Sequence, residues 1–260
     1  MQEVLKREMG SRGVYRGMVS ATGSAGTIAS GDFMKELFPA SKIVASEALQ
    51  CPTLLENGFG AHRIEGIGDK HVPWIHNVKN TDLVVAIDDN AVVNLSRLFN
   101  EPIGRAYLSK QGVPEAIIHR LDLLGFSGIS NLLSAIKFAK YFEMGEEDIV
   151  LTILTDSMEL YASRLGEMHK EFGVYRETDA AAHFARYLHG ASTENLLELS
   201  YADRRRVHNL KYFTWVEQQG KTYQEINAQW YDRDYWSGFQ GQAQEIDALI
   251  EEFNNEVCIE

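Results

Sequence analysis

Four short runs of apolar and β-branched residues, separated by helix-like patterns, constrain the fold of this chain more than any other feature. The runs are GMVSA (17–21), KIVASEA (42–48), DLVVAID (82–88) and DIVLTIL (148–154). They are continuously apolar rather than alternating, which is typical of parallel strands covered on both faces. Helical patterns lie at about 27–38, 90–99, 114–124 and 130–143. We therefore predict an α/β domain with a mostly parallel sheet over residues 1–160.

The character of the sequence changes after residue 160, where strand-like runs give way to helical patterns. Examples are ETDAAAHFARYLHG, SYADRRRVHNLKYFTWVEQQG and GQAQEIDALIEEFNNEV. We predict a helical extension over residues 161–260. Its aromatic residues either pack the extension on the α/β core or form a contact surface for another chain; they include Trp215, Trp230, Tyr231, Tyr235 and Trp236.

Charge and composition exclude several classes of function. The formal net charge of −12 argues against a nucleic-acid binder, which needs a basic face. The basic cluster Arg204–Arg206 is interpreted as a solvated helix face. Cys51 and Cys258 are far apart and suit a reducing cytoplasm, and Cys51 is expected in the core rather than as a nucleophile. No metal-ligand spacing, membrane-length apolar run or signal peptide is present, so we expect no metal, no membrane contact and a cytoplasmic location.

The segment ATGSAGT (21–27) joins the first predicted strand to the first predicted helix. Its small residues Gly23, Ser24, Ala25, Gly26 and Thr27 let backbone N–H groups approach an anion, and the helix N-terminus adds free donors. The spacing matches neither GxxxxGK[ST] nor GxGxxG, which disfavours a nucleoside triphosphate or a dinucleotide. A phosphate loop and a plain tight turn both remain open on this segment alone. The long stretch 49–80 is of a length that is usually functional.

Five segments in order resemble the large domain of fold-type II pyridoxal-phosphate-dependent enzymes. They are GSAGT (23–27), VASEALQCPTLL (44–55), EGIGDKHVP (65–73), FSG (126–128) and DSMELYAS (156–163). The nearest resemblance is to cysteine synthase and cystathionine β-synthase, in the tryptophan synthase β superfamily, and it covers roughly residues 3–163. It implies that this chain corresponds to the C-terminal half of such an enzyme.

The resemblance also implies the site residues. Gly23–Thr27 would hold the phosphate of pyridoxal 5′-phosphate, provided that Ala25, where glycine is usual, keeps a negative φ. Ser127 would hydrogen-bond the pyridine nitrogen; its neutral hydroxyl would leave the ring a weak electron sink, which favours β-elimination or β-replacement. A helix N-cap is the alternative role for Ser127.

Glu65, Gly66, Ile67 and Gly68 would pass the reactive face of the cofactor, although this segment also reads as a loop that binds no ligand. His71 is a candidate acid–base group or a solvated loop residue. Asp69, Lys70 and His71 stand where the sulfhydrylases carry small or apolar residues, which implies a more polar amino-acid substrate.

The family's catalytic lysine lies well before the phosphate loop, and no lysine of this chain falls at a matching position; Lys6 matches a helix instead. We therefore expect no catalytic residue in this chain. The lysine would come from a missing N-terminal half or a partner subunit, and the chain would bind another polypeptide or form a homo-oligomer. The alternative is a non-catalytic relative that serves as a binding or regulatory subunit.

Overall fold

The computed structural model describes residues 2–10, 12–21, 23–68 and 70–257. Asp69 and Cys258 lie outside the described residues. The chain forms two compact units that divide between Leu210 and Lys211, and each is described by itself.

The first unit is built on a five-stranded sheet in the order β4-β1-β2-β3-β5. The strands are β1 (Val14–Ala21), β2 (Lys42–Ala48), β3 (Leu83–Ile87), β4 (Asp148–Thr152) and β5 (Leu196–Glu198). The first four are mutually parallel, and β5 pairs antiparallel with β3 at the edge of the sheet. The predicted α/β fold with a mostly parallel sheet is therefore confirmed.

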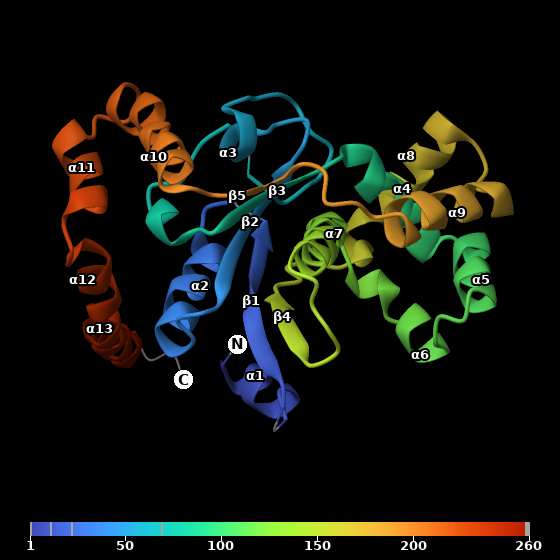
Figure 1. Ribbon diagram of the computed structural model, residues 1–260, viewed down its shortest axis with the longest axis horizontal. Coiled ribbons are helices and arrows are strands. Elements are labelled where there is room, and N and C mark those ends of the chain that lie inside the picture. The colour runs from blue at the N-terminus through green and yellow to red at the C-terminus, as the bar shows by residue number, and fades with distance from the viewer. Residues whose placement is uncertain (1, 11, 22, 69, 258–260) are drawn as a thin grey trace. The chain divides into compact units, whose positions relative to one another are not determined.

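Helices cover both faces of this sheet, with α2 on one side and α7 on the other (Figure 1). Val44 and Val85 belong to the larger core cluster, which includes side chains of α4 and α7. Ile43, Ala45 and Val84 belong to a second cluster, on the side of α2 and α10. Because successive strand residues point to opposite faces and both faces are buried, the strands read as continuous apolar runs.

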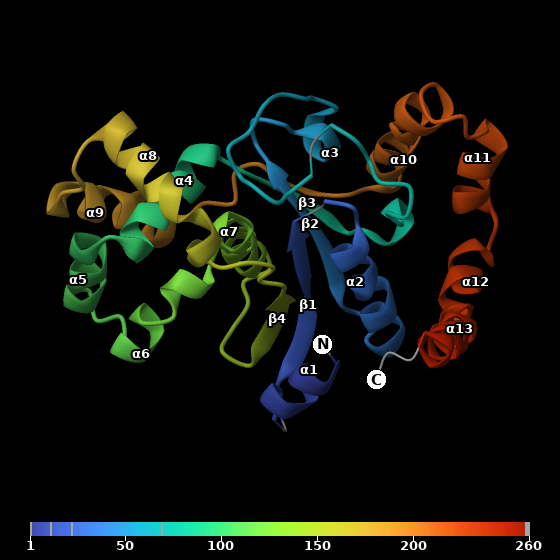
Figure 2. The same cartoon turned by 180° about the vertical axis from the view of Figure 1, so that it is seen from behind.

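The helices of the first unit are mostly short. They are α1 (Gln2–Glu8), α2 (Gly26–Leu37), α3 (Thr53–Glu56), η1 (Val78–Asn80), α4 (Asp89–Asn100), α5 (Pro102–Lys110), α6 (Glu115–Ile118), η2 (Leu121–Leu123), α7 (Phe126–Tyr141), η3 (Met158–Tyr161), α8 (Ala162–Phe172), α9 (Glu177–His183), η4 (Phe184–His189) and α10 (Tyr201–Asn209). The segment between β2 and β3, which carries α3, lies over the carboxyl ends of these strands (Figure 2).

Residues 161–210 belong to the first compact unit, whereas the sequence places a domain boundary at residue 160. Met168 of α8 and Ala180 of α9 are buried in the same cluster as the strands. The strand β5 also lies in this region, where the sequence predicts helices alone. It is three residues long and pairs through Leu196, Leu197 and Glu198, which is too short for a recognisable strand pattern.

The arginine cluster of α10 is not the solvated face that the sequence suggests. Arg204 donates to the carbonyl of Thr81 and pairs with Asp82 at 3.1 Å, and Arg206 donates to the carbonyls of Leu54 and Leu55. A run of charged residues on a helix predicts a solvated face. The sequence does not reveal the partners of these arginines, because they lie more than a hundred residues away along the chain. These bonds fasten α10 to the sheet and to α3.

The described residues of the second unit form helices joined by short turns, with no strand. It contains η5 (Tyr212–Val216), α11 (Tyr223–Tyr231), α12 (Tyr235–Gly241) and α13 (Ala243–Glu256). The buried Lys211 donates to Gln229 Oε1 at 2.6 Å, and the indole of Trp236 donates to the carbonyl of Gln229. The rings of Tyr235, Trp236 and Phe239 contact one another within this unit, and Trp230 is buried.

Replacing Asp82 with Asn should destabilise the first unit. The Asp82 carboxylate is almost fully buried, pairs with Lys35 at 2.6 Å and with Arg204, and accepts the backbone N–H of Ile43. Asn would leave two cations partly buried without a counter-charge, at a cost of about 2–4 kcal/mol. Urea unfolding measures the change, with the exposed Asp122→Asn as a matched control. Equal midpoints for the two variants would contradict the network.

Candidate active site

The candidate site lies at the carboxyl edge of the parallel strands, where ligands bind in open α/β sheets. β1 ends at Ala21 and leads into α2, and β4 ends at Thr152 and leads to Asp156. Asn131 of α7 holds the two strand ends together, because its Oδ1 accepts the N–H of Ala21 and its Nδ2 donates to the carbonyl of Ile153. The sequence analysis did not single out Asn131, since its role depends on strands that are far apart in sequence.

The predicted phosphate loop leads directly into α2. α2 begins at Gly26, and the backbone amides of residues 23–28 donate to no acceptor among the described residues. Ser24 is exposed, whereas the hydroxyl of Thr27 lies 2.6 Å from that of Ser20. A Cβ at Gly26 would meet no atom within 4 Å, so the space that a side chain at this position would enter is open.

Ala25 does not keep the negative φ that the sequence argument requires. Its φ of 70° lies in the left-handed region, where a side chain costs about 1 kcal/mol. Ala25 is nevertheless buried, and its methyl group packs in the cluster with Ile28. The backbone at Ala25 therefore has the conformation that glycine would favour, although the residue is alanine.

Gly66 lies between the loop and Ser127. A Cβ on Gly23 would lie 3.9 Å from the carbonyl oxygen of Gly66. A Cβ on Gly66 would lie 3.9 Å from the Cβ of Ser127 and 4.0 Å from its Oγ. The φ of Gly66 is +81°, a conformation that glycine adopts without strain. The structure thus brings together Gly23, Gly66 and Ser127, which are distant in sequence.

Ser127 lies in the first turn of α7 and is 2% exposed. Gly125 is the N-cap residue, so Ser127 does not cap the helix. Its Oγ lies 2.9 Å from Oγ1 of Thr155 and 3.4 Å from Oδ1 of Asp156. Tyr161 donates its hydroxyl to Oδ2 of Asp156, and the backbone N–H of Gly125 donates to the carbonyl of Asp156. The hydroxyl of Ser127, the carboxylate of Asp156 and the hydroxyl of Tyr161 are therefore joined by hydrogen bonds.

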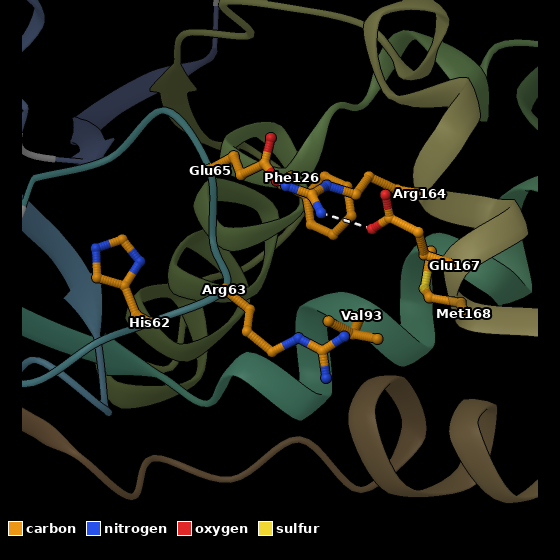
Figure 3. Close-up of a pocket in the computed structure, with 8 residues that line it drawn as sticks. All are labelled: His62, Arg63, Glu65, Val93, Phe126, Arg164, Glu167 and Met168. Atoms are coloured by element: carbon orange, nitrogen blue, oxygen red, sulfur yellow. Dashed lines mark hydrogen bonds and ion pairs between the residues drawn. The ribbon is translucent and has the colours of Figure 1, made fainter. Parts of the chain in front are cut away.

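Glu65 lines a neighbouring cavity of about 320 Å³ (Figure 3). In this cavity Glu65 forms an ion pair with Arg164, which also contacts Glu167 at 2.6 Å. The other lining residues are His62, Arg63, Val93, Phe126 and Met168. Arg164 of α8 thus fixes one end of the Glu65–Gly68 segment.

The remaining candidates of the sequence analysis are placed as follows. Ile67 packs against the main core cluster, and the carbonyl of Gly68 lies 3.1 Å from Nε2 of His62. His71 is half-buried and Cys51 is buried, as expected for a core cysteine.

Within the described part of the chain, no group of three or more acidic, histidine or cysteine side chains is arranged to hold a metal ion. None of the described helices combines the length and apolarity needed to cross a membrane.

Glu47, at the end of β2, is a buried carboxylate beside this edge. Burial raises the pKa of Glu47 to about 7. The N–H groups of Leu54 and Leu55, which donate to the carboxylate, and the charge of Arg206 act in the opposite direction and lower this pKa. The bonds from Leu54 and Leu55 fix the start of the segment that leads to Gly66.

The curated relatives of this chain include cysteine synthases and a cystathionine β-synthase. The chain is 30% identical to cysteine synthase B of Campylobacter jejuni over 146 residues, which is 56% of this chain and 42% of that protein. It is 27% identical to cystathionine β-synthase of Apis mellifera over 152 residues, 56% of this chain and 26% of that protein. The chain therefore spans less than half the length of these curated relatives. No family model matches the sequence.

Solved structures show the same fold. O-acetyl serine sulfhydrylase isoform 3 from Entamoeba histolytica has a TM-score of 0.51 and 21% identity, over 72% of this chain and 49% of that chain. A hydrogen sulfide-producing enzyme from Fusobacterium nucleatum has a TM-score of 0.50 and 22% identity, over 76% of this chain and 52% of that chain. At this level of identity the likeness concerns the fold alone.

Replacing Gly125 with Ala should displace Asp156 and destabilise the first unit. The added Cβ would overlap the Asp156 carboxylate, and overpacking of this kind costs about 1–3 kcal/mol. Gly166→Ala on the exposed face of α8 is the matched control, since the added Cβ would meet no atom within 4 Å. Because glycine is unfavourable within a helix, this substitution should stabilise the chain by about 0.5–1 kcal/mol. Chemical denaturation compares the two, and equal effects would contradict the packing of Gly125 on Asp156.

Glu47 should make stability fall as the pH rises from about 5 to about 7. The folded state holds the Glu47 proton more tightly than the unfolded chain, whose pKa is near 4.5, so the unfolded state releases its proton first. The loss is about 3 kcal/mol for a shift of this size. Glu47→Gln should not show this loss of stability with rising pH. The pKa of Asp32 is also raised, to about 6, and the difference between the two stability–pH curves separates the effect of Glu47 from that of Asp32. Parallel curves would contradict this prediction.

Proposed function

We propose that this chain, whose homologues are cysteine synthases and cystathionine β-synthase, forms the phosphate- and ring-binding part of a pyridoxal-phosphate-dependent enzyme that eliminates or replaces a group at the β-carbon of an amino acid. The homologues are pyridoxal-phosphate-dependent enzymes, and the fold is that of fold type II. The observation that carries the proposal is the juxtaposition of Gly23, Gly66 and Ser127 beside uncommitted backbone amides.

The loop at residues 23–27 fits a phosphate group. Its amides and the start of α2 supply donors and the positive end of the helix dipole, and the exposed Ser24 hydroxyl lies on the same loop. Gly26 leaves the space in front of these donors open. Thr27 supports the loop through its contact with Ser20 rather than by a free hydroxyl. In this assignment Gly23, Ser24, Ala25, Gly26 and Thr27 bind the phosphate mainly through their backbone.

Ser127 and the segment from Glu65 to Gly68 fit the ring and the substrate side. Ser127 is buried beside Gly66, whose missing side chain leaves the space between them open. Pyridoxal phosphate, when bound, supplies the electron sink for bond breaking at the amino acid. The residues of this chain position the cofactor, and Arg164 holds Glu65 out of its way.

The catalytic lysine is proposed to come from a missing N-terminal half or from a partner subunit, since the matched region spans 42% of cysteine synthase B. His71 is proposed to face the substrate from the same segment as Lys70, and these groups favour a polar amino acid. A cytoplasmic location is consistent with this chemistry.

Replacing Gly26 with Val should abolish cofactor binding and leave the fold intact. The side chain would enter the open space in front of the amides, and Val is no worse than Gly within a helix. The probe is 4′-deoxypyridoxine 5′-phosphate, which keeps the ring and the phosphate and needs no lysine. Calorimetry should show at least a tenfold loss of affinity for the variant at unchanged far-UV circular dichroism.

Gly145→Val is the matched control, because its Cβ also meets no atom within 4 Å and it precedes the amino end of β4. Equal binding by the two variants would contradict the phosphate assignment. Addition of pyridoxal phosphate then separates the two functions that the sequence allows: visible absorbance that develops with a lysine-bearing partner supports the enzyme, and its absence with every partner supports a binding subunit.

A further inference from the structure

A separate cavity of about 450 Å³ lies between the end of β3, α7 and the loop that joins η4 to β5. Lys137 on its wall follows Ser127 along α7 by ten residues, which is about 15 Å along a helix axis. We propose that this cavity binds an amino acid with an apolar side chain, in its zwitterionic form. This site is distinct from the cofactor site of the proposed function, and neither depends on the other.

The floor of the cavity is apolar. It is lined by Ala86 and Ile87 of β3, Ala91 of α4 and Leu133 of α7, none of which is more than 7% exposed. Pockets that bind small molecules typically have a volume of about 300–1,000 Å³, a mainly apolar lining and a few polar groups that orient the ligand. The floor therefore fits an aliphatic side chain.

Asp88, which directly follows β3, supplies a negative charge with one oxygen uncommitted. Its Oδ1 accepts the backbone N–H of Asn90 and the side-chain amide of Gln50, both at 3.0 Å. Among the residues that the structure describes, Oδ2 has no donor and the carboxylate has no cation as a partner. The carboxylate is thus held through one oxygen, and the other is available to the ammonium group of a ligand.

Arg186 of η4 supplies a positive charge to the same cavity. Its guanidinium lies over the ring of Tyr187, 5.2 Å from the centroid, and the Tyr187 hydroxyl accepts from Nδ2 of Asn94 at 3.3 Å. Arg186 forms no ion pair with any described residue. Stacking of this kind orients a guanidinium and leaves the N–H groups at its edge available to a carboxylate.

The cavity has a second cation, Lys137, which is already committed. It donates to the carbonyls of Ser192 and Glu194, at 3.1 and 2.7 Å. Burial lowers the pKa of Lys137, and the nearby Glu194 carboxylate acts in the opposite direction. Lys137 therefore holds the loop before β5 and has the charge of Glu194 beside it. Asp88 and Arg186 are the charges of the cavity that remain for a ligand.

These two charges select the class of ligand. A simple anion would be attracted by Arg186 and repelled by Asp88, and an amine would experience the reverse. A zwitterion satisfies both charges, which act more strongly beside an apolar floor than they would in water. An amino acid places its ammonium group on Asp88 and its carboxylate on Arg186 while its side chain covers the floor.

Three related ligands test the assignment one group at a time. They are L-leucine, 4-methylpentanoate, which lacks the ammonium group, and 3-methylbutylamine, which lacks the carboxylate. Ligand-observed NMR with the full chain should show leucine binding at millimolar concentrations and each analogue binding at least tenfold more weakly. Arg186→Gln should weaken leucine at least tenfold but not weaken 3-methylbutylamine. Asp88→Asn should weaken leucine at least tenfold but not weaken 4-methylpentanoate.

Both substitutions should leave the fold intact. Asp88 is the N-cap residue of α4, and Asn is an equally good N-cap that keeps the Oδ1 acceptor. Arg186 is exposed, so its loss removes little packing. Urea unfolding checks this directly, and unfolding midpoints close to that of the unchanged chain are expected.

Arg120→Gln and Asp122→Asn are the matched controls, since each removes the same charge from an exposed position outside the cavity. Both should bind leucine like the unchanged chain. The assignment is overturned if the unchanged chain does not bind leucine, or if the cavity variants and the controls bind it equally well. Leucine binding that survives both Arg186→Gln and Asp88→Asn would place the ligand elsewhere and would overturn it too. The phosphate assignment has its own test and is unaffected by these outcomes.

Discussion

The central strands carry apolar side chains on both faces, so the sheet is stable only while helices cover both of them. Each fully buried side chain of this kind contributes about 1.5–3 kcal/mol. Val44 and Val85 face one cluster and Ile43 and Val84 the other. This requirement fixes α2 and α7 on opposite sides of the sheet. It also places the starts of both helices at the carboxyl edge, where Gly26 and Ser127 then lie.

α7 is held against the sheet by polar contacts as well as by packing. The hydroxyl of Ser46 on β2 lies 2.8 Å from that of Ser134 and 3.3 Å from that of Ser130, and all three are buried. Asn131 bonds the ends of β1 and β4. Buried polar groups are stable only when they are paired, so these contacts allow one register of the helix on the strands. Ser127, one turn before Asn131, is positioned by the same contacts.

The parts of the fold that could be predicted from sequence are those in which local pattern and burial agree. The four parallel strands, α2, α4 and α7 were expected within a few residues of their positions. β5 and the pairing of Arg204 with Asp82 could not be predicted, because each depends on a partner more than a hundred residues away. The same holds within the site: the residues of the loop and Ser127 follow from motifs, whereas the positive φ of Ala25 and the position of Asp156 depend on tertiary contacts.

The two carboxylates of the site region differ because their partners differ. Glu65 meets Arg164, so its charge is neutralised and serves to anchor the segment that carries Gly66. The Asp156 carboxylate accepts from the hydroxyl groups of Ser127 and Tyr161, which hydrogen-bond the charge without neutralising it. In a partly buried site an uncompensated charge acts over several ångströms, since little water screens it. Asp156 follows β4 and Ser127 lies at the start of α7, so their contact exists only once these two elements pack together, and the sequence motifs alone could not reveal it.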